Sequence, residues 1–356
     1  MEKYRQFADG GTGVNPFVPV WSHHKSGLVM QCAKLALLSL ALLRLCMVVT
    51  AFLWLVLAEL LCWPLGFLPI VRRPLHWLLS YAGCSLALLG LGFWFTAGGH
   101  VLADHRRLKL APPKVNSSSC YDARRGCLVL SNTQGLTDVL YLGMRLCPVF
   151  VFPAVDGSPV PYYSVLGALR RAGARRASVP VETPQSLKDI AEAARTGWRG
   201  PVVVFPEGAR TNGTAVLAWK KTTFEGLESF EKPVGTALVT LEYNKAGAYT
   251  PHHTIGTMFK HILFLCIQPF HSVKSTWLPA TDVATVVKGK PVPESMVLLR
   301  SVLTRMIAGA VEVDVYAEKH QDFMAFWEAS QKKGYTKATK KLQPQDGQVR
   351  ISVQWS

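Results

Sequence analysis

Two long apolar runs near the N-terminus constrain the fold of this chain more than any other feature. From Ala33 to Val71 the sequence is almost continuously apolar, interrupted only by Lys34, Arg44 and Glu59. A second run, from Leu75 to Ala97, contains no Lys, Arg, Asp or Glu. Because a helix needs about 20 apolar residues to cross a bilayer, both runs are candidates for membrane helices, and together they predict a helical hairpin.

The turn of this hairpin is expected at the polar residues between the runs. Pro64 and Pro69 should end the first helix, and Arg72–Pro74 should join it to the second. The basic flank at Arg106–Lys114 favours the cytosolic side for both hairpin ends. Arginines at the tip weigh against a full crossing, because a re-entrant hairpin lets them snorkel back to the surface. The sequence leaves three arrangements open: spanning, re-entrant, and a soluble pair of core helices.

The composition narrows the classes of partner. A formal net charge of +16 predicts anionic partners, either nucleic acid or an anionic membrane surface. The membrane is favoured because 49% of the residues are hydrophobic, and the chain lacks the interleaved basic and aromatic residues of a nucleic-acid module. Eight cysteines are spread singly, without CxxC or Cys/His spacing. We therefore expect no metal site and a reducing compartment.

From about residue 98 the sequence resembles that of a globular domain. Strands are expected near residues 127–131, 148–152, 202–205, 234–241 and 311–315, and helices near 160–172, 184–196, 215–230 and 293–308. This alternation predicts the α/β class, with a mixed sheet flanked by helices. The expected divisions are a polar N-terminal segment (1–27), the membrane hairpin (28–97), the α/β domain (98–325) and a basic C-terminal tail (326–356).

One stretch of this domain has the composition of a ligand-binding turn. Val202–Phe205 is an apolar run typical of a buried strand, and Pro206 ends it. Gly208 marks a turn, so Glu207 and Arg210 lie just beyond the strand's carboxyl end, where open α/β sheets place ligands. A guanidinium and turn amides suit a phosphate. The alternative is a strand-to-turn corner with an Arg–Glu surface pair.

A second block precedes it. The apolar run 127–131 is followed by Asn-Thr-Gln-Gly-Leu-Thr-Asp at 132–138. Together the blocks resemble the glycerolipid acyltransferases that make phosphatidic acid, which carry Asn-His-x-x-x-x-Asp after one strand and Phe-Pro-Glu-Gly-Thr-Arg after another. Phe205–Arg210 differs from the latter pattern at one position. The first block keeps Asn132 and Asp138 but has Thr133 at the histidine position.

The resemblance implies transfer of a fatty acyl group from acyl-CoA to lysophosphatidic acid, with acyl-CoA as co-substrate and no bound cofactor. In this family a histidine accepts the hydroxyl proton, because its pKa lies near the working pH, and the aspartate orients it. By position, Glu207, Gly208 and Arg210 would bind the substrate phosphate, and Asp138 would keep the orienting place. Lys220 is an expected further substrate contact, with solvation as the alternative; the same holds for its neighbour, Lys221.

Thr133 leaves the predicted site without its base, because an unactivated hydroxyl does not accept a proton near neutral pH. A general base contributes about 10²–10⁴ in rate, whereas positioning supplies about 7–11 kcal/mol, so the sequence predicts a slow enzyme. Asp138 is a candidate replacement base. The other candidates are histidines that we expect at the surface or at interfaces: His100, His105, His252 and His253.

The family also has an arginine block between the two motifs. The segment 167–180 contains four arginines, any of which could fill that role or form a solvated helix face: Arg170, Arg171, Arg175 and Arg176.

The N-terminal residues indicate a branch of the family. Met1–Tyr4, Gly11–Gly13 and Pro16-Phe17 resemble the fungal lysophosphatidic acid:oleoyl-CoA acyltransferases, also described as vacuolar protein sorting factors, whose members likewise lack the histidine. The resemblance implies phosphatidic acid synthesis, for phospholipid and triacylglycerol, at the endoplasmic reticulum membrane and lipid droplet, with a cytosolic catalytic domain. The alternative is a degenerate acyltransferase that binds lipid as a scaffold without turnover.

Overall fold

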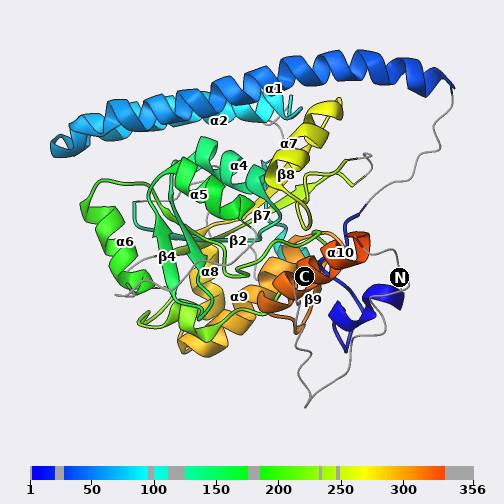
Figure 1. Ribbon diagram of the computed structural model, residues 1–356. Coiled ribbons are helices and arrows are strands. Elements are labelled where there is room, and N and C mark those ends of the chain that lie inside the picture. Colours follow the sequence, from blue (N-terminus) through cyan, green and yellow to red (C-terminus); the bar gives the residue numbers. More distant parts are fainter. Residues whose placement is uncertain are drawn as a thin grey trace, which may run out of the picture.

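The computed structural model describes residues 2–20, 28–94, 100–110, 125–174, 185–231, 235–245 and 249–332. Within these ranges a mixed seven-stranded sheet carries helices on both faces, and two long helices lie across one of them (Figure 1). The predicted α/β class is confirmed.

The sheet places its four central strands in parallel. Its strand order is β1-β8-β7-β2-β5-β3-β4, in which β7, β2, β5 and β3 run parallel, β8 is antiparallel to β7, and β4 is antiparallel to β3. The strand bounds are β1 (His100–Leu102), β2 (Leu128–Ser131), β3 (Val149–Pro153), β4 (Pro159–Tyr162), β5 (Val202–Val204), β7 (Thr236–Tyr243) and β8 (Val273–Leu278), and a separate pair is β6 (Ala215–Val216) with β9 (Val311–Glu312). Since β2 and β5 are parallel neighbours, their carboxyl ends lie at the same edge.

Helices and short 3-10 turns fill the connections. They are η1 (Glu2–Phe7), α1 (Leu28–Cys62), η2 (Pro64–Phe67), α2 (Pro69–Gly90), α3 (His105–Leu108), α4 (Leu136–Leu146), α5 (Val165–Gly173), α6 (Leu187–Thr196), η3 (Lys221–Phe224), α7 (Met258–Ile267), α8 (Ala280–Val287), α9 (Val292–Met306) and α10 (Glu318–Lys332). The predicted helices at 184–196 and 293–308 are confirmed as α6 and α9. The predicted boundary between residues 325 and 326 falls inside α10.

Two expected helices are corrected. Residues 215–230 form β6, turns and η3 rather than a helix, because Ala218 N donates to Val315 O at 3.0 Å and holds the segment extended. The helix expected at 160–172 begins only at Val165, since the preceding residues form β4. The strand expected at 311–315 is limited to the two residues of β9.

Alternate side chains of the strands build two cores. Val129 and Val203 point into a core shared with α4, α5, α7 and the long helices. Leu128 and Val202 point the other way, into a core with α6, α8 and α9. This two-residue period explains why continuous apolar runs mark the central strands, which are buried on both faces.

Helices α1 and α2 form the predicted hairpin, side by side above α4 and α7 (Figure 1). Their close approach depends on glycine: a Cβ on Gly83 would lie 2.7 Å from Leu55 Cδ2, and one on Gly90 would lie 2.8 Å from Val48 Cγ2. The segment Leu37–Cys62 is long and apolar enough to cross a membrane. Residues 95–97 of the second predicted run lie outside the described residues.

The predicted turn of the hairpin is corrected. Residues 72–74 lie inside α2, and the turn is formed by η2. Pro64 stops α1, whereas Pro69 stands at the start of α2, where a missing N–H costs nothing. Pro74 follows within the first two turns and is accommodated there. The arginines of this segment therefore lie on a helix that packs against the domain.

Arg44, the charge in the middle of α1, docks the hairpin onto the domain. Its guanidinium is buried and donates to the carbonyls of Gln268 (2.7 Å) and Pro269 (2.6 Å), just beyond the C-terminus of α7. A cation at a helix C-terminus bonds carbonyls that have no partner inside the helix. The hairpin thus lies along the domain.

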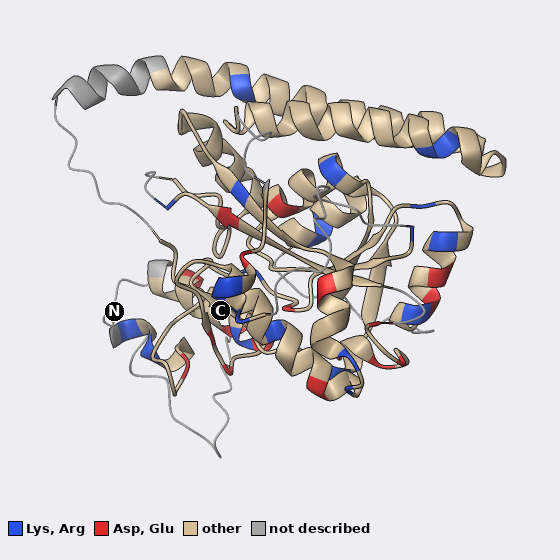
Figure 2. Cartoon of the chain, turned by 180° about the vertical axis from the view of Figure 1, so that it is seen from behind, with Lys and Arg blue, Asp and Glu red and all other residues tan. Residues whose placement is uncertain are grey.

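The opposite side of the hairpin is apolar and exposed. Figure 2 shows few charged residues on the hairpin and many on the domain beneath it. Its exposed large apolar side chains include Leu38, Leu42, Leu43, Val49, Leu53, Leu57, Leu60 and Leu61 of α1 and Ile70, Val71, Trp77 and Leu78 of α2. A face of this kind is typical of contact with a membrane.

The N-terminal segment and α10 form a third core. Phe7 and Phe17 pack against Phe323 of α10, together with Val313 and Val315. Asn212, just beyond the predicted phosphate turn, donates to the carbonyls of residues 15 and 18. The polar N-terminus is thereby fastened to the carboxyl edge of the sheet, and α10 is brought to the same place.

Candidate functional site

The two sequence motifs meet at one cavity. Thr133 follows β2, and Thr211 N, in the loop after β5, donates to Thr133 O at 2.9 Å. Thr133 lines a cavity together with the whole predicted turn, Glu207 to Arg210. The further wall residues include the end of β3 with residues 154 and 155, the end of α5, residues 218 and 220, and the start of α10. The parallel pairing of β2 with β5 therefore unites segments far apart in the sequence.

Glu207 fastens the two loops together. Its buried carboxylate accepts hydrogen bonds from Thr133 N and Leu217 N, both at 3.0 Å. Burial raises its pKa to about 8, against the effect of these two bonds. A surface pair of Glu207 with Arg210 is therefore wrong, because both side chains are buried and each has other partners.

Arg210 is held rigidly at the cavity wall. Its Nη1 donates to Ala172 O, at 3.0 Å, and to His253 Nδ1, at 2.9 Å. Gly208, two residues earlier, has φ of +67°, in the left-handed region that favours glycine. The left-handed Gly208 turns the chain so that Glu207 and Arg210 both line the cavity.

One arginine of the predicted block reaches the same cavity. Arg171 lines it, donates to Gly208 O at 3.4 Å and stacks its guanidinium over the Phe152 ring, 5.3 Å from the centroid. Burial lowers its pKa. Arg170 is exposed, and residues 175–176 lie outside the described residues. The cavity wall thus carries two guanidinium groups.

Asp138 lies behind the cavity wall rather than in it. One carboxylate oxygen accepts from Gln134 N and Gly135 N at the start of α4, and the other accepts from Tyr243 Oη at 2.6 Å. Burial raises its pKa to about 6, although these bonds oppose the rise. Both oxygens are engaged and the residue is fully buried, so Asp138 is not placed as a base.

Asn132, the other residue of the first motif that matches the family pattern, helps to hold two strands together. Its side-chain amide donates to Leu241 O at 3.0 Å and accepts from Leu241 N at 2.8 Å, which extends the pairing of β2 with β7. The hydroxyl of Thr133 differs from both: Thr133 Oγ1 is buried at the cavity, and within the described part of the chain it has no hydrogen-bond partner.

A histidine that the sequence analysis missed lines this cavity. His320, in the first turn of α10, is buried and its Nε2 lies 2.8 Å from Thr254 O. Since a carbonyl only accepts, Nε2 carries the proton and Nδ1 keeps its lone pair. Burial and the nearby charge of Arg210 lower the pKa of His320 to about 3. No local sequence signal marks His320, because it reaches the site only through the packing of α10.

The histidines considered from the sequence are not placed on the cavity. His252 and His253 were expected at the surface or at an interface, and their burial rules out the surface position for both. His253 accepts from Arg210 and stacks on His261, with ring centroids 4.5 Å apart. His105 pairs with Asp282, at 3.1 Å, between α3 and α8. None of these three histidines, nor His100 of β1, is among the described residues that line the cavity.

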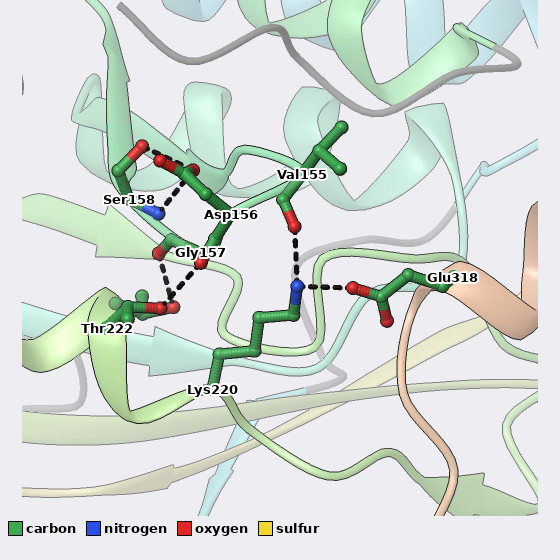
Figure 3. Close-up of polar contacts among 8 residues, drawn as sticks. Val155, Asp156, Gly157, Ser158, Lys220, Thr222 and Glu318 are labelled. Atoms are coloured by element: carbon green, nitrogen blue, oxygen red, sulfur yellow. Dashed lines mark hydrogen bonds and ion pairs between the residues drawn. The ribbon is translucent and has the colours of Figure 1, made fainter.

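Lys220 closes one rim of the cavity. Its ammonium group donates to Val155 O and pairs with Glu318 of α10 (Figure 3). Nearby, Thr222 Oγ1 donates to Asp156 O at 2.9 Å and holds the turn after β3 (Figure 3). Lys220 therefore ties α10 to this turn and lines the cavity at the same time. Lys221 is exposed.

The described residues contain no group of three or more His, Cys, Asp and Glu side chains that could hold a metal ion. The cavity instead combines two guanidinium groups, an imidazole and a hydroxyl with the Lys220–Glu318 ion pair and the buried carboxylate of Glu207. This set can bind an anion and move a proton near it.

Comparisons with known proteins point to lipid chemistry. No family model matches the chain, and no solved structure matches it. Over 217 residues, 59% of its length, the chain is 21% identical to lysophosphatidylcholine acyltransferase 1 of Danio rerio. It spans 38% of the length of that protein. The chain is therefore a distant relative of a lysophospholipid acyltransferase, and its exposed hairpin fits association with a membrane.

Proposed function

We propose that this protein transfers a fatty acyl group from acyl-CoA to the free hydroxyl of lysophosphatidic acid, as the fungal branch that its N-terminus resembles does with oleoyl-CoA. The observation that carries the proposal is the convergence on one cavity of the Glu207–Arg210 turn, Thr133, Arg171 and His320. The similarity to a lysophospholipid acyltransferase supports it.

Arg210 and Arg171 are proposed to bind the substrate phosphate. Guanidinium groups bind phosphate oxygens bidentately, and two of them at one wall match a phosphate monoester better than the single phosphodiester of a choline head group. Arg210 is fixed by Ala172 O and His253, so little ordering is needed on binding. Glu207 acts in this proposal by holding the turn.

His320 is proposed to accept the hydroxyl proton in place of the family's histidine. Its Nε2–H is fixed on Thr254 O, so the ring is oriented as a catalytic imidazole requires. Burial and then the charge of Arg210 lower the pKa of His320, and a bound phosphate dianion offsets the second of these effects. Substrate binding would therefore raise the basicity of the ring at the moment when it is needed.

The reaction balances without a cofactor. The glycerol oxygen bonds to the thioester carbonyl carbon while its proton passes to His320 Nδ1. The carbon–sulfur bond then breaks, and the coenzyme A thiolate takes the proton from His320, which restores the neutral ring. In this scheme Thr133 Oγ1 donates a hydrogen bond to the oxyanion that forms on the carbonyl; removing such a donor typically costs about 10²–10³ in rate.

The hairpin is proposed to seat the domain on one leaflet, with the exposed face of α1 and α2 in the lipid and the domain on the cytosolic side. The endoplasmic reticulum membrane and the lipid droplet monolayer both fit this arrangement, because neither requires a crossing. Helix α7, which carries the exposed Phe259 and Phe264, contacts α1 of the hairpin (Figure 1).

The test is acyl transfer by the purified full chain in liposomes, with oleoyl-CoA and either lysophosphatidic acid or lysophosphatidylcholine, followed by mass spectrometry. We expect phosphatidic acid to form, and His320→Gln to slow it about 100-fold. Arg210→Gln should raise KM for lysophosphatidic acid. His105→Gln is the matched control, because His105 has a carboxylate partner away from the cavity.

Two outcomes decide against this proposal. Equal turnover of wild type and His320→Gln would remove His320 as the base. No turnover of either lysolipid, with lysophosphatidic acid still bound through Arg210, would leave the alternative of a lipid-binding scaffold that descends from an acyltransferase.

A further inference from the structure

A second cavity lies at the opposite edge of the sheet. It is lined by the start of α2, the end of α4, the start of β3 and residues 197–200. Strand β3 begins at this cavity with Val149 and ends at the first cavity with Pro153. The two cavities are thus at opposite ends of one strand, and the chemistry proposed above does not use the second.

A thiol and an imidazole line this second cavity, and a carboxylate contacts the imidazole from behind. Cys147 Sγ lies 3.2 Å from His76 Nδ1, and His76 Nε2 lies 3.3 Å from Glu59 Oε1. The three residues come from the residue after α4, from α2 and from α1. A nucleophile next to a ring nitrogen, with the other nitrogen held by a third group, is the arrangement that activates thiols for acyl transfer.

The arrangement also has a structural interpretation, in which Glu59 needs a polar partner within an apolar helix. His76 alone would satisfy that need. The structural interpretation therefore does not explain why a thiol contacts the other ring nitrogen. Cys147 has φ of +43°, an unfavourable value for a residue with a side chain, and it is partly exposed. Burial disfavours a charged ring, but the bonds to Cys147 and Glu59 raise the pKa of His76 to about 10.

The walls of the second cavity match a particular kind of ligand. Arg72, Arg73 and Arg199 line it, and the pKa of Arg199 is lowered by burial and by the charge of Arg72. Three guanidinium groups at one small cavity favour an anionic ligand. Trp77 also lines the cavity and is exposed, as Ile70 is on the same helix. The walls are therefore cationic on one side and continuous with the membrane-facing surface on the other.

We propose that Cys147 is an S-acylation site that takes a fatty acyl group from a long-chain acyl-CoA. The phosphates of acyl-CoA lie on Arg72 and Arg199, its chain lies along the exposed face of α2, and its thioester meets Cys147. The bond from Cys147 Sγ to the carbonyl carbon forms as the carbon–sulfur bond of acyl-CoA breaks. His76 gives a ring proton to the leaving thiolate and takes the Cys147 proton in its place, so no oxidant or reductant is needed.

This modification adds an acyl chain where the hairpin turns, at the end of the apolar face. It is independent of the proposed reaction at the first cavity, because neither Thr133 nor His320 is involved. The two proposals therefore succeed or fail separately: Cys147→Ser removes the acylation site and leaves phosphatidic acid synthesis at the first cavity in place.

The experiment is incubation of the purified full chain in detergent with palmitoyl-CoA, followed by peptide mass spectrometry before and after hydroxylamine, which cleaves thioesters. We expect one palmitoyl group on Cys147. His76→Gln should slow its appearance about 100-fold, and Arg199→Gln should raise the palmitoyl-CoA concentration for half-maximal rate. Cys46→Ser is the matched control, because Cys46 is exposed on α1 and has no ring nitrogen bonded to it in the described structure.

Palmitoyl on Cys46 at the same rate as on Cys147 would overturn the proposal, since it would show uncatalysed exchange at any open thiol. No hydroxylamine-sensitive palmitoyl on the wild type would overturn it as well. Where His76→Gln lowers the melting temperature, the comparison of Cys147 with Cys46 within the wild type decides the matter without that variant.

Discussion

Restoring a histidine at position 133 tests whether the scaffold still holds an acyltransferase site. In the glycerolipid acyltransferases that the two motifs resemble, an aspartate lies behind that histidine, and Asp138 stands at its position. In this structure, however, one Asp138 oxygen accepts from two backbone N–H groups and the other accepts from Tyr243 Oη at 2.6 Å. A new imidazole at position 133 must therefore displace or share the Tyr243 hydroxyl before Asp138 can orient it.

The magnitude follows from that hydrogen bond. A bond to a charged group contributes about 1.5–3 kcal/mol, and 1.36 kcal/mol corresponds to tenfold in rate. We expect Thr133→His alone to give a small gain, and Thr133→His with Tyr243→Phe to be faster by about 10- to 150-fold. Tyr243→Phe alone should change turnover little, because Asp138 lies outside the cavity.

The assay is phosphatidic acid formation from oleoyl-CoA and lysophosphatidic acid, followed by mass spectrometry. Tyr141→Phe is the matched control, because the Tyr141 hydroxyl is also buried but contacts Ser275 Oγ, at 3.1 Å. Equal rates for Thr133→His with and without Tyr243→Phe would refute the argument. The same gain with Tyr141→Phe would refute it too, because the effect would then be general loosening.

Three further predictions use the same structure. Gly208→Ala and Gly256→Ala each place a side chain at positive φ, so each should lower the free energy of unfolding by about 1–2 kcal/mol. Only Gly208→Ala should also slow acyl transfer. Equal losses of rate in the two variants would contradict the role of the Glu207–Arg210 turn. Leu53→Lys with Leu60→Lys, at side chains 65% and 63% exposed, should weaken binding to uncharged phosphatidylcholine liposomes, where added lysines gain no attraction, without lowering the melting temperature. Unchanged binding would remove this face from the membrane contact. Burial lowers the pKa of His252, His261 and His320 from 6.5 to about 3. Their contribution to stability is therefore complete above pH 6.5 and is lost as pH falls below it, by about 1.4 kcal/mol per pH unit for each histidine. Melting temperatures should rise between pH 4 and pH 6.5, and a flat profile would contradict the burial of these rings.

The parts of the fold that the sequence predicts are those with a local signal. Central strands such as β2 and β5 are buried on both faces, and their short apolar runs show it. The hairpin is equally visible as two apolar runs. Its turn was predicted wrongly because Arg72–Pro74 has the composition of a break, whereas a proline near a helix start breaks little, and Pro64 had already ended the first helix.

The candidate site was predictable in part for the same reason. The turn after β5 carries its own proline and glycine signals, and Thr133 follows a strand. Their meeting depends on the pairing of β2 with β5, which the α/β pattern makes plausible but does not fix. His320 was missed because it reaches the cavity only when α10 packs against Phe7 and Phe17. Contacts between segments far apart in the chain leave no periodic pattern in the sequence of either segment.

The contacts of Glu207 and Asp138 change what these two motif residues indicate about catalytic activity. Glu207 and Asp138 together accept hydrogen bonds from four buried backbone N–H groups. Such groups are costly to leave without a partner, at about 1–3 kcal/mol each. Folding alone therefore explains why both carboxylates persist, and their presence does not separate an active enzyme from an inactive descendant.

In the proposed reaction, Arg210 and Arg171 bind the phosphate and His320 accepts the proton. The two arginines bring positive charge to a wall that folding alone could have built from apolar residues, and burial lowers the pKa of Arg171, which is a cost rather than a gain for stability. His320 lines the same cavity with its Nε2 fixed on Thr254 O, and in the proposed reaction it is the proton acceptor that Thr133 cannot be. A binding scaffold has use for the arginines but none for the imidazole, so the response of turnover to His320→Gln separates the two functions.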